Sequence, residues 1–422
     1  MTNDTGMTTF LARMLGNGIE TRSEGGVAPS SLGPARPIGQ WAFAGVAVTS
    51  FGVLALTGLY APSIAGGASS SAGLVMVLAA VAFGFALAIW FGYSRHVSSS
   101  GGLYSFTEAA AGRRVALVQA SLWTLSYLLY LVYTTAQIVY DTLPAVLPGE
   151  VRYQTPLEVV IPVVLAGVMI AGRTVTLAVM GLLAAGQLVL AATLSGLTLA
   201  NVSTPVSTFG TSAPAGSLAI VSSQTAVLYI CGSLPFFLGG ELGGDLRQAG
   251  HRMRGGVLAA YVAVVAIVIA AVAPLAAFPS LMHTEIPGMA VAQAFSGRGL
   301  AVAVGIGVAA SLAGSILVEY LALSRLAVTV TSWSLRRVLV GLGVVLVAVS
   351  PVLLINPDEI YDHLITPSLV ALWLSQLITF AVYPRFVARR GGRVLPAGLL
   401  AAGASALAIY GVVLTIQTSS IS

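Results

Sequence analysis

The residues best suited to bind a ligand lie in one apolar stretch, residues 222–254, whose centre is poor in helix-forming residues. Six glycines and prolines fall within thirteen positions there: Gly232, Pro235, Gly239, Gly240, Gly243 and Gly244. Proline removes a backbone donor and glycine destabilises helices, so we expect the helix to break. In a membrane, such a break persists only inside protein or beside a water-filled cavity. The carbonyls freed around Pro235, Leu238 and Gly239 could then accept hydrogen bonds from an ammonium group.

A second interrupted stretch lies in residues 38–66, where Thr49, Ser50 and Gly52 fall in mid-span. Amides freed at a break and the N-terminal ends of half-helices attract anions, so Thr49 to Gly52 are candidates for holding a substrate carboxylate. The alternative is that the two hydroxyls bond back to carbonyls of their own helix. Paired interruptions in corresponding halves of a chain indicate the midplane site of an inverted-repeat transporter.

Aromatic and small side chains complete this candidate substrate site. Phe236 is placed to cap it. Tyr127, Tyr130 and Tyr133 share a helix face at spacing three, and we expect at least one phenol to line the cavity. Cys231 lies at the second break, where a small buried apolar role is the alternative. The candidate substrate-binding residues are Thr49, Ser50, Phe51, Gly52, Tyr127, Cys231, Gly232, Ser233, Pro235, Phe236, Leu238 and Gly239.

Neither break carries a charged residue: there is none between Val46 and Leu56, and none between Tyr229 and Gly240. A strongly cationic substrate would require a deep carboxylate near the break, and a dicarboxylic one would require an arginine or lysine. The sequence therefore favours a small neutral or zwitterionic amine, most simply an apolar or aromatic amino acid.

The composition requires a membrane around these sites. The chain is 57% hydrophobic and 8% charged, with a mean hydropathy of +0.94, which is typical of a polytopic all-α membrane protein in contact with a lipid bilayer. A net charge of +5 would suggest nucleic acid in a soluble chain, but here the arginines fall in short loops, so we expect no nucleic-acid partner. The single cysteine excludes an intramolecular disulfide and a cysteine-rich metal site. No cofactor or metal is expected, apart from a coupling proton or sodium ion.

Eleven apolar segments are long enough to be membrane spans. They fall near residues 38–66, 72–94, 115–143, 156–172, 174–200, 220–245, 255–278, 299–330, 337–355, 360–387 and 395–417. All 19 basic residues are arginine, and only Arg152 and Arg298 fall outside when the N-terminus is inside, a split of 17 to 2. This bias predicts a plasma-membrane protein with a flexible cytoplasmic tail over 1–36, a transmembrane domain over 37–417 and a short external tail over 418–422.

Three motifs resemble those of the amino acid–polyamine–organocation (APC) permeases. The run 101–106, GGLYSF, followed by Gly112, is similar to that family's "GG-x-Y-x-Y … G" loop. The run 237–241, FLGGE, resembles its "F-x-G-x-E" motif, and Ser324-Arg325 resembles its "SR" signature. The three occur in the family's order and on the expected side of the membrane.

This resemblance implies a LeuT-like fold, with inverted five-helix repeats over about 38–200 and 220–387 and an extra helix over 395–417. The substrate would lie between broken helices one and six. The chain departs from the family after Glu241, where Gln248-Ala249 replaces an acidic pair, and it lacks a twelfth segment. It also lacks a lysine in segment five, where Gln187 is the only strongly polar side chain deep in the span.

Segment eight carries the candidate coupling groups. Glu319 is an acid within the membrane, which is costly and usually faces a cavity or a partner. It is either a protonatable coupling group or the structural partner of Arg325. Ser311 and Ser315 share a helix face, and in sodium-coupled relatives of this fold hydroxyls of this helix bind the cation. Glu241 and Asp245 are expected at the cytoplasmic mouth, close to Arg247.

Other classes of protein fit less well. The four histidines are scattered over loops, and no phosphate-binding glycine loop or Asp-rich motif is present, which disfavours an intramembrane enzyme. The sequence predicts a secondary active transporter that works by alternating access, and it does not indicate an oligomeric state. The alternative is a sensor or structural subunit that retains the fold without transport.

Overall fold

The structure is a computed structural model, and it describes residues 37–147, 153–354 and 357–419. The predicted tail 1–36, Arg152 and the last three residues of the predicted external tail lie outside the described residues. Within the described part, nine helices are long and apolar enough to cross a membrane. The first of them, Gln40–Ser94, contains two of the predicted segments, and the predicted segment 156–172 is a shorter apolar helix, Gln154–Ile170. Each of the eleven predicted segments is therefore helical, and the all-α polytopic fold is confirmed.

The first repeat begins with an interrupted segment. It consists of α2 (Gln40–Phe51), α3 (Val53–Ala55), a π-helical turn η1 (Leu56–Tyr60) and α4 (Ala61–Ala65). The helices that follow it are α5 (Ala72–Ser94), the short α6 (Leu103–Ala111), α7 (Arg113–Ala136), α9 (Gln154–Ile170) and α10 (Arg173–Asn201). The helix α7 continues through the π-helical turn η3 (Gln137–Thr142) into α8 (Leu143–Val146). Only two residues separate α9 from α10, and Gly172 turns the chain there with a φ of 111°.

The later elements begin with the second interrupted segment, which consists of α11 (Ala215–Val227) and the 3₁₀ helix η6 (Ile230–Glu241). The membrane helices after it are α12 (Leu246–Val272), α15 (Arg298–Val330), α16 (Leu335–Val349), α17 (Pro357–Ala381) and α19 (Val394–Ser419). The short helices α13 (Pro279–Met282) and α14 (Pro287–Ser296) connect α12 to α15, and α18 (Tyr383–Ala388) follows α17.

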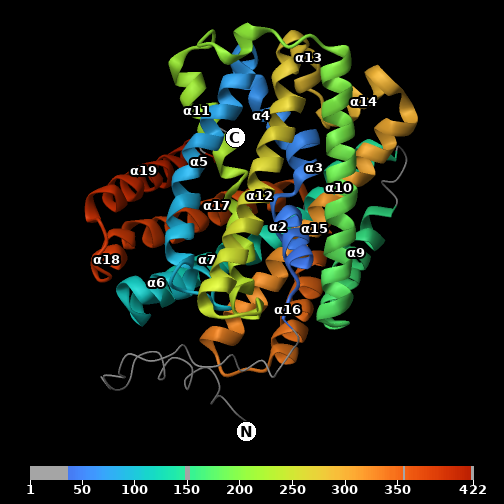
Figure 1. The fold of residues 1–422 in the computed structure, drawn as a ribbon. Helices are drawn as coiled ribbons and strands as arrows, with labels where there is room; N and C mark the ends of the chain where they lie inside the picture. The colour runs from blue at the N-terminus through green and yellow to red at the C-terminus, as the bar shows by residue number, and fades with distance from the viewer. Residues whose placement is uncertain (1–36, 148–152, 355–356, 420–422) are drawn as a thin grey trace. The chain divides into compact units, whose positions relative to one another are not determined.

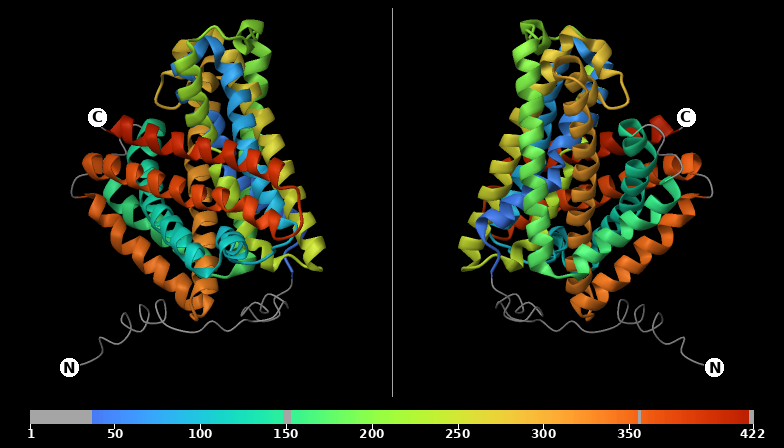
Figure 2. Two further views of the ribbon diagram at one scale, coloured as in Figure 1. Left: turned by 90° about the vertical axis from the view of Figure 1, so that its left-hand side faces the viewer. Right: turned by 90° about the vertical axis from the view of Figure 1, so that its right-hand side faces the viewer.

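The helices that position the site meet at the centre of the bundle. α2 packs against α10, α12, α15 and η6, and α7 packs along α17 (Figure 1). In Figure 1 the start of α16 lies at the same end of the bundle as α6, whereas α13 and α14 lie toward the opposite end. The red helices α17 and α19 lie side by side and are strongly inclined to the green helix α10, as both views in Figure 2 show. The two interrupted segments are therefore enclosed by continuous helices, which is the surrounding that a break at membrane depth requires.

Candidate functional site

The first break is centred on Gly52. Its φ of 58° and ψ of 52° place it in the left-handed region, so the α2 helix cannot continue through it. A Cβ at this position would lie 3.1 Å from the Ser315 hydroxyl, so the close approach of α15 also requires glycine. The break predicted in segment one is present, at the predicted residue.

The second break begins earlier than predicted. The α-helix ends at Val227, and the chain resumes at Ile230 as a 3₁₀ helix that contains Pro235. A 3₁₀ helix of twelve residues is unusually long, because runs of more than four residues are uncommon. Gly232 of this helix packs on the Phe51 ring, where a Cβ would come within 2.5 Å of the ring carbons. The two breaks are therefore in direct contact.

Between the breaks lies a cavity of about 150 Å³, the central cavity. Six of the sequence-predicted residues line it: Ser50, Phe51, Gly52, Tyr127, Cys231 and Ser315. All three tyrosines at spacing three on α7 contribute to its wall, together with Tyr60 from η1, which the sequence analysis missed. The remaining wall is mainly aliphatic, from Ala55, Leu56, Val227, Leu228, Ile230, Leu312, Ile365, Leu369 and Leu372, with Ser126 as a further polar residue.

The other candidates on the second break do not line the central cavity. Gly232 and Ser233 lie beside it, Gly232 against Phe51 and Ser233 next to the Tyr127 hydroxyl. The Phe236 ring packs on Trp90 and Phe106, at 5.9 and 5.7 Å between ring centroids, rather than over the cavity. The buried Pro235 lies in the same 3₁₀ helix, and Leu238 lines a separate cavity of about 90 Å³ near Glu241. The 3₁₀ helix has 3.0 residues per turn, so the faces expected for an α-helix do not apply to it.

Three of the expected ligand groups are already bonded within the protein. The Gly239 carbonyl accepts a hydrogen bond from the Ser98 hydroxyl at 2.7 Å, so it is not free for an ammonium group. Thr49 donates to the Met180 carbonyl of α10 at 3.0 Å, whereas Ser50 donates to Ala47 of its own helix at 2.8 Å. The expected bond back to the same helix therefore holds for Ser50 and is wrong for Thr49.

The serine pair on α15 ties three segments together. Ser311 donates to the Gln187 side-chain oxygen at 2.8 Å and accepts from the Ala55 amide at 3.2 Å. Ser315 donates to the Ser311 carbonyl at 3.3 Å, and its hydroxyl faces Gly52. The two serines thus lie against the first break, where the predicted coupling cation would have to bind.

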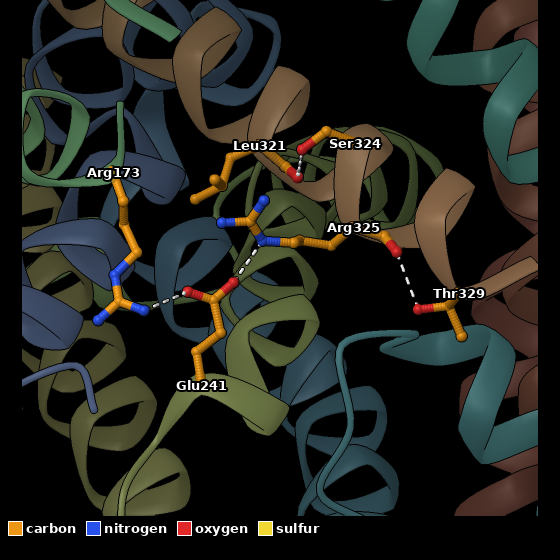
Figure 3. A network of polar contacts seen from close by, with 6 residues as sticks. All are labelled: Arg173, Glu241, Leu321, Ser324, Arg325 and Thr329. Carbon is orange, nitrogen blue, oxygen red and sulfur yellow. Dashed lines mark hydrogen bonds and ion pairs between the residues drawn. The ribbon is translucent and has the colours of Figure 1, made fainter. Parts of the chain in front are cut away.

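Glu319, one turn beyond Ser315, is fully buried, and neither of its oxygens has a hydrogen-bond partner among the described residues. The expected alternative, a pair with Arg325, is wrong. Arg325 is itself buried and forms an ion pair with Glu241, at the end of η6 (Figure 3). Arg173, at the start of α10, binds the other oxygen of Glu241 at 3.3 Å. This three-residue cluster, Arg173–Glu241–Arg325, is called the inner ion cluster below, after the side of the membrane on which the arginine distribution predicts it to lie.

The expected contact of Glu241 and Asp245 with Arg247 is replaced by other contacts. Glu241 is used in the inner ion cluster, and Asp245 caps α12 by accepting from the Gln248 amide at 2.7 Å. Aromatic side chains pack behind Tyr127 in the cavity wall: the ring centroids of Trp123 and Tyr127 lie 4.3 Å apart, and those of Trp123 and Phe237 lie 4.5 Å apart. Tyr127 is thereby connected to Phe237 of η6 through Trp123.

No protein-family model and no curated protein matches the sequence. Solved structures do match the fold. MhsT in complex with L-phenylalanine superposes with a TM-score of 0.58 at 14% sequence identity, over 92% of this chain and 100% of MhsT. The manganese transporter of Eremococcus coleocola superposes with a TM-score of 0.61 at 11% identity in two structures. One is a variant, covering 93% of this chain and 94% of the transporter, and the other is a complex with an aromatic bis-isothiourea compound, covering 92% and 91%.

The chain has the LeuT fold. The sequence resemblance to APC permeases therefore predicted the architecture correctly. The matching structures support the fold and do not assign the chain to the APC family. Among the described residues, no three His, Cys, Asp or Glu side chains gather in a way that could hold a metal ion. The central cavity of this LeuT-fold chain is instead phenolic and aliphatic.

Proposed function

We propose that the chain is a secondary active transporter that moves a small amine-bearing solute across the plasma membrane by alternating access. The observation that carries this proposal is the central cavity, which lies where two interrupted helices of a LeuT fold touch each other. Interrupted helices facing each other at the midplane are the arrangement that secondary transporters use to bind a substrate.

The chemistry of the cavity favours an amine with an apolar body. Four tyrosines and Phe51 surround it, and aromatic faces attract cations as well as apolar groups. MhsT, which shares the fold, is described in complex with L-phenylalanine, a solute of this kind. A metal such as zinc or copper is a poorer fit, because thiolate or imidazole ligands would be required and the cavity offers a single thiol, Cys231.

Coupling to an ion belongs to the same proposal. The buried Glu319 is suited to carry a proton, whereas Ser311 and Ser315 are the alternative site for a sodium ion. Alternating access requires one side to be closed while the other opens, and the inner ion cluster is suited to hold the inner side closed. The second candidate function is a transport-inactive sensor, which the replacement of the family's acidic pair by Gln248-Ala249 favours.

Two measurements on purified protein test the proposal. A thermal-shift screen of neutral amino acids and monoamines identifies a ligand, since a ligand at a hundred times its Kd stabilises by about 2.7 kcal/mol. Counterflow of the labelled ligand into proteoliposomes then separates the two functions. We expect uptake against preloaded unlabelled ligand. Binding without any counterflow would establish the sensor instead.

A further inference from the structure

Glu319 belongs to a group of buried polar side chains that are incompletely bonded. Its two carboxylate oxygens are buried and have no hydrogen-bond partner among the described residues, and the Tyr127 and Ser233 hydroxyls, which lie next to each other, form no well-aligned hydrogen bond. A buried polar group without a partner is costly, and a buried charge without one is more costly still. Such a group of atoms on three different segments, α7, η6 and α15, indicates a site for something that the protein binds.

This group lies just behind the wall of the central cavity. Tyr127, Cys231 and Ser315 line the cavity, and Glu319 lies one turn of α15 beyond Ser315, close enough to Tyr127 and Cys231 to interact with them electrostatically. The other titratable groups in its range are the phenols of Tyr60 and Tyr130, which also line the cavity. No basic side chain is among these neighbours. The arginine on the same helix, Arg325, is bound to Glu241.

At the first break, in contrast, the groups that the sequence assigned to a substrate carboxylate are already bonded. The Thr49 and Ser50 hydroxyls both donate to backbone carbonyls, and the Gly52 amide bonds to the Thr49 carbonyl at 3.0 Å. The Ala55 amide donates to Ser311. The donors that the sequence assigned to a substrate carboxylate are therefore used within the protein.

We propose that Glu319 binds the ammonium group of the solute and exchanges it for a proton, so that the solute is a small organic monoamine without a carboxylate. This inference rests on the proposed transport function and narrows its substrate. The cavity volume of about 150 Å³ sets the size of the apolar body. An engineered cavity of about that volume holds benzene, so one ring or its equivalent fits.

The exchange follows from the cost of a buried charge. The Glu319 carboxyl is tolerated in two states, either neutral with its proton or ionised with a cation beside it. When the ammonium binds, the carboxyl loses its proton to water, and when the ammonium leaves, a proton returns. One proton therefore moves in the direction opposite to each amine, and the charge carried across the membrane in a full cycle is zero.

The test uses calorimetric titration of the whole purified protein with phenethylamine and with L-phenylalanine, which share a ring and an amine and differ by the carboxylate. We expect phenethylamine to bind more tightly and to release close to one proton per molecule bound, measured from the heat in buffers of different ionisation enthalpy. In the pH range where the Glu319 carboxyl is protonated in the free protein, the apparent Kd of phenethylamine should rise about tenfold for each unit by which the pH is lowered, because binding releases one proton.

Glu319→Gln should weaken phenethylamine binding at least about thirtyfold and abolish the proton release. Glu158→Gln is the matched control. Glu158 is also fully buried, on α9, but it accepts a hydrogen bond from Ser350 at 2.7 Å and is not close to the cavity residues Tyr127 and Cys231 as Glu319 is. The Glu158→Gln variant should bind phenethylamine as tightly as the wild-type protein and release the same number of protons.

Three outcomes overturn the inference. They are phenethylamine binding without proton release in the wild-type protein, equal binding by Glu319→Gln, and tighter binding of L-phenylalanine than of phenethylamine. The wild-type titrations decide the matter even if Glu319→Gln fails to fold. Counterflow of L-phenylalanine that survives in Glu319→Gln would reject this inference and leave the transport function standing, whereas binding without any counterflow would reject the transport function alone.

Discussion

Glu241 and Arg325 form a buried ion pair between the end of η6 and the inner part of α15 (Figure 3). These residues belong to the two separate sequence motifs, FLGGE and Ser324-Arg325, that resemble APC permeases. Arg173 adds a third segment to the same cluster. A movement of η6 away from α15 must break this pair, so the inner ion cluster holds the Glu241 end of η6 against α15.

Glu241→Gln should open the inner side and destabilise the protein. Arg325 would be left buried without a counter-charge, which costs about 3–5 kcal/mol when one partner of a buried pair is removed. The measurements are the thermal midpoint and the labelling, from the inside, of a cysteine introduced at Leu238. Asp245→Asn, a charge change at an exposed site that preserves the cap of α12, is the control and should leave both unchanged. Equal behaviour of the two variants would contradict a closing role for Glu241.

Tyr60→Phe should speed the release of bound solute to the outside. The Tyr60 hydroxyl donates to the Gln137 side-chain oxygen, and Gln137 also lines a larger cavity of about 480 Å³ near Asp141 and Glu285. This contact therefore joins the wall of the central cavity to the wall of the larger one. Loss of a hydrogen bond of about 1 kcal/mol predicts an increase of roughly fivefold in the dissociation rate, measured by displacement of a labelled ligand. Ser63→Ala, an exposed hydroxyl in α4 that bonds only to its own helix, is the control. An unchanged rate in Tyr60→Phe would show that the outer side closes elsewhere.

Gly52→Ala should destabilise the protein and reduce solute binding. The left-handed conformation costs a non-glycine residue roughly 1–2 kcal/mol, and the added Cβ would press on the Ser315 hydroxyl. Gly84→Ala is the matched control, because Gly84 lies within α5 with nothing within 4 Å of a Cβ. That substitution should be neutral or stabilise by up to about 1 kcal/mol. Gly52→Ala should therefore lower the thermal midpoint and Gly84→Ala should not, and an unchanged midpoint in Gly52→Ala would mean that the break tolerates a side chain.

The orientation in the membrane is open to direct measurement. The arginine split of 17 to 2 predicts that a reporter in the 246–254 loop is cytoplasmic and that one fused after Ser422 is external. Substituted-cysteine labelling in intact cells should therefore modify the fusion end and leave the loop protected. A protected C-terminal end would require the number of spanning segments to be revised.

Hydrophobicity and loop composition were sufficient to predict the helical segments and both breaks, because these depend on local preferences. Gly52 illustrates this, since glycine and hydroxyl residues in mid-span mark the break directly. The faces of η6 were not predictable in the same way. Once Pro235 and its neighbours form a 3₁₀ helix, the positions that point to the cavity change, and Phe236 packs away from it.

Partners from distant segments were equally beyond local patterns. Arg325 has Glu319 six residues away on its own helix, yet it pairs with Glu241 from another segment, which only the packing of η6 against α15 determines. Tyr60 was missed because it lies beyond the break, in a π-helical turn whose wider winding alters the expected face. Its position in the same interrupted segment as Gly52 was the feature of the sequence that could have indicated Tyr60 as a cavity residue.

The contact between Gly232 and the Phe51 ring has a mechanical consequence. The ring fills the space that a side chain would take on η6, so each interrupted segment is shaped to the surface of the other. Neither can tilt alone without opening a void or colliding with its neighbour. We therefore expect the two interrupted segments to change their tilt together, in one concerted step of the cycle, rather than one after the other.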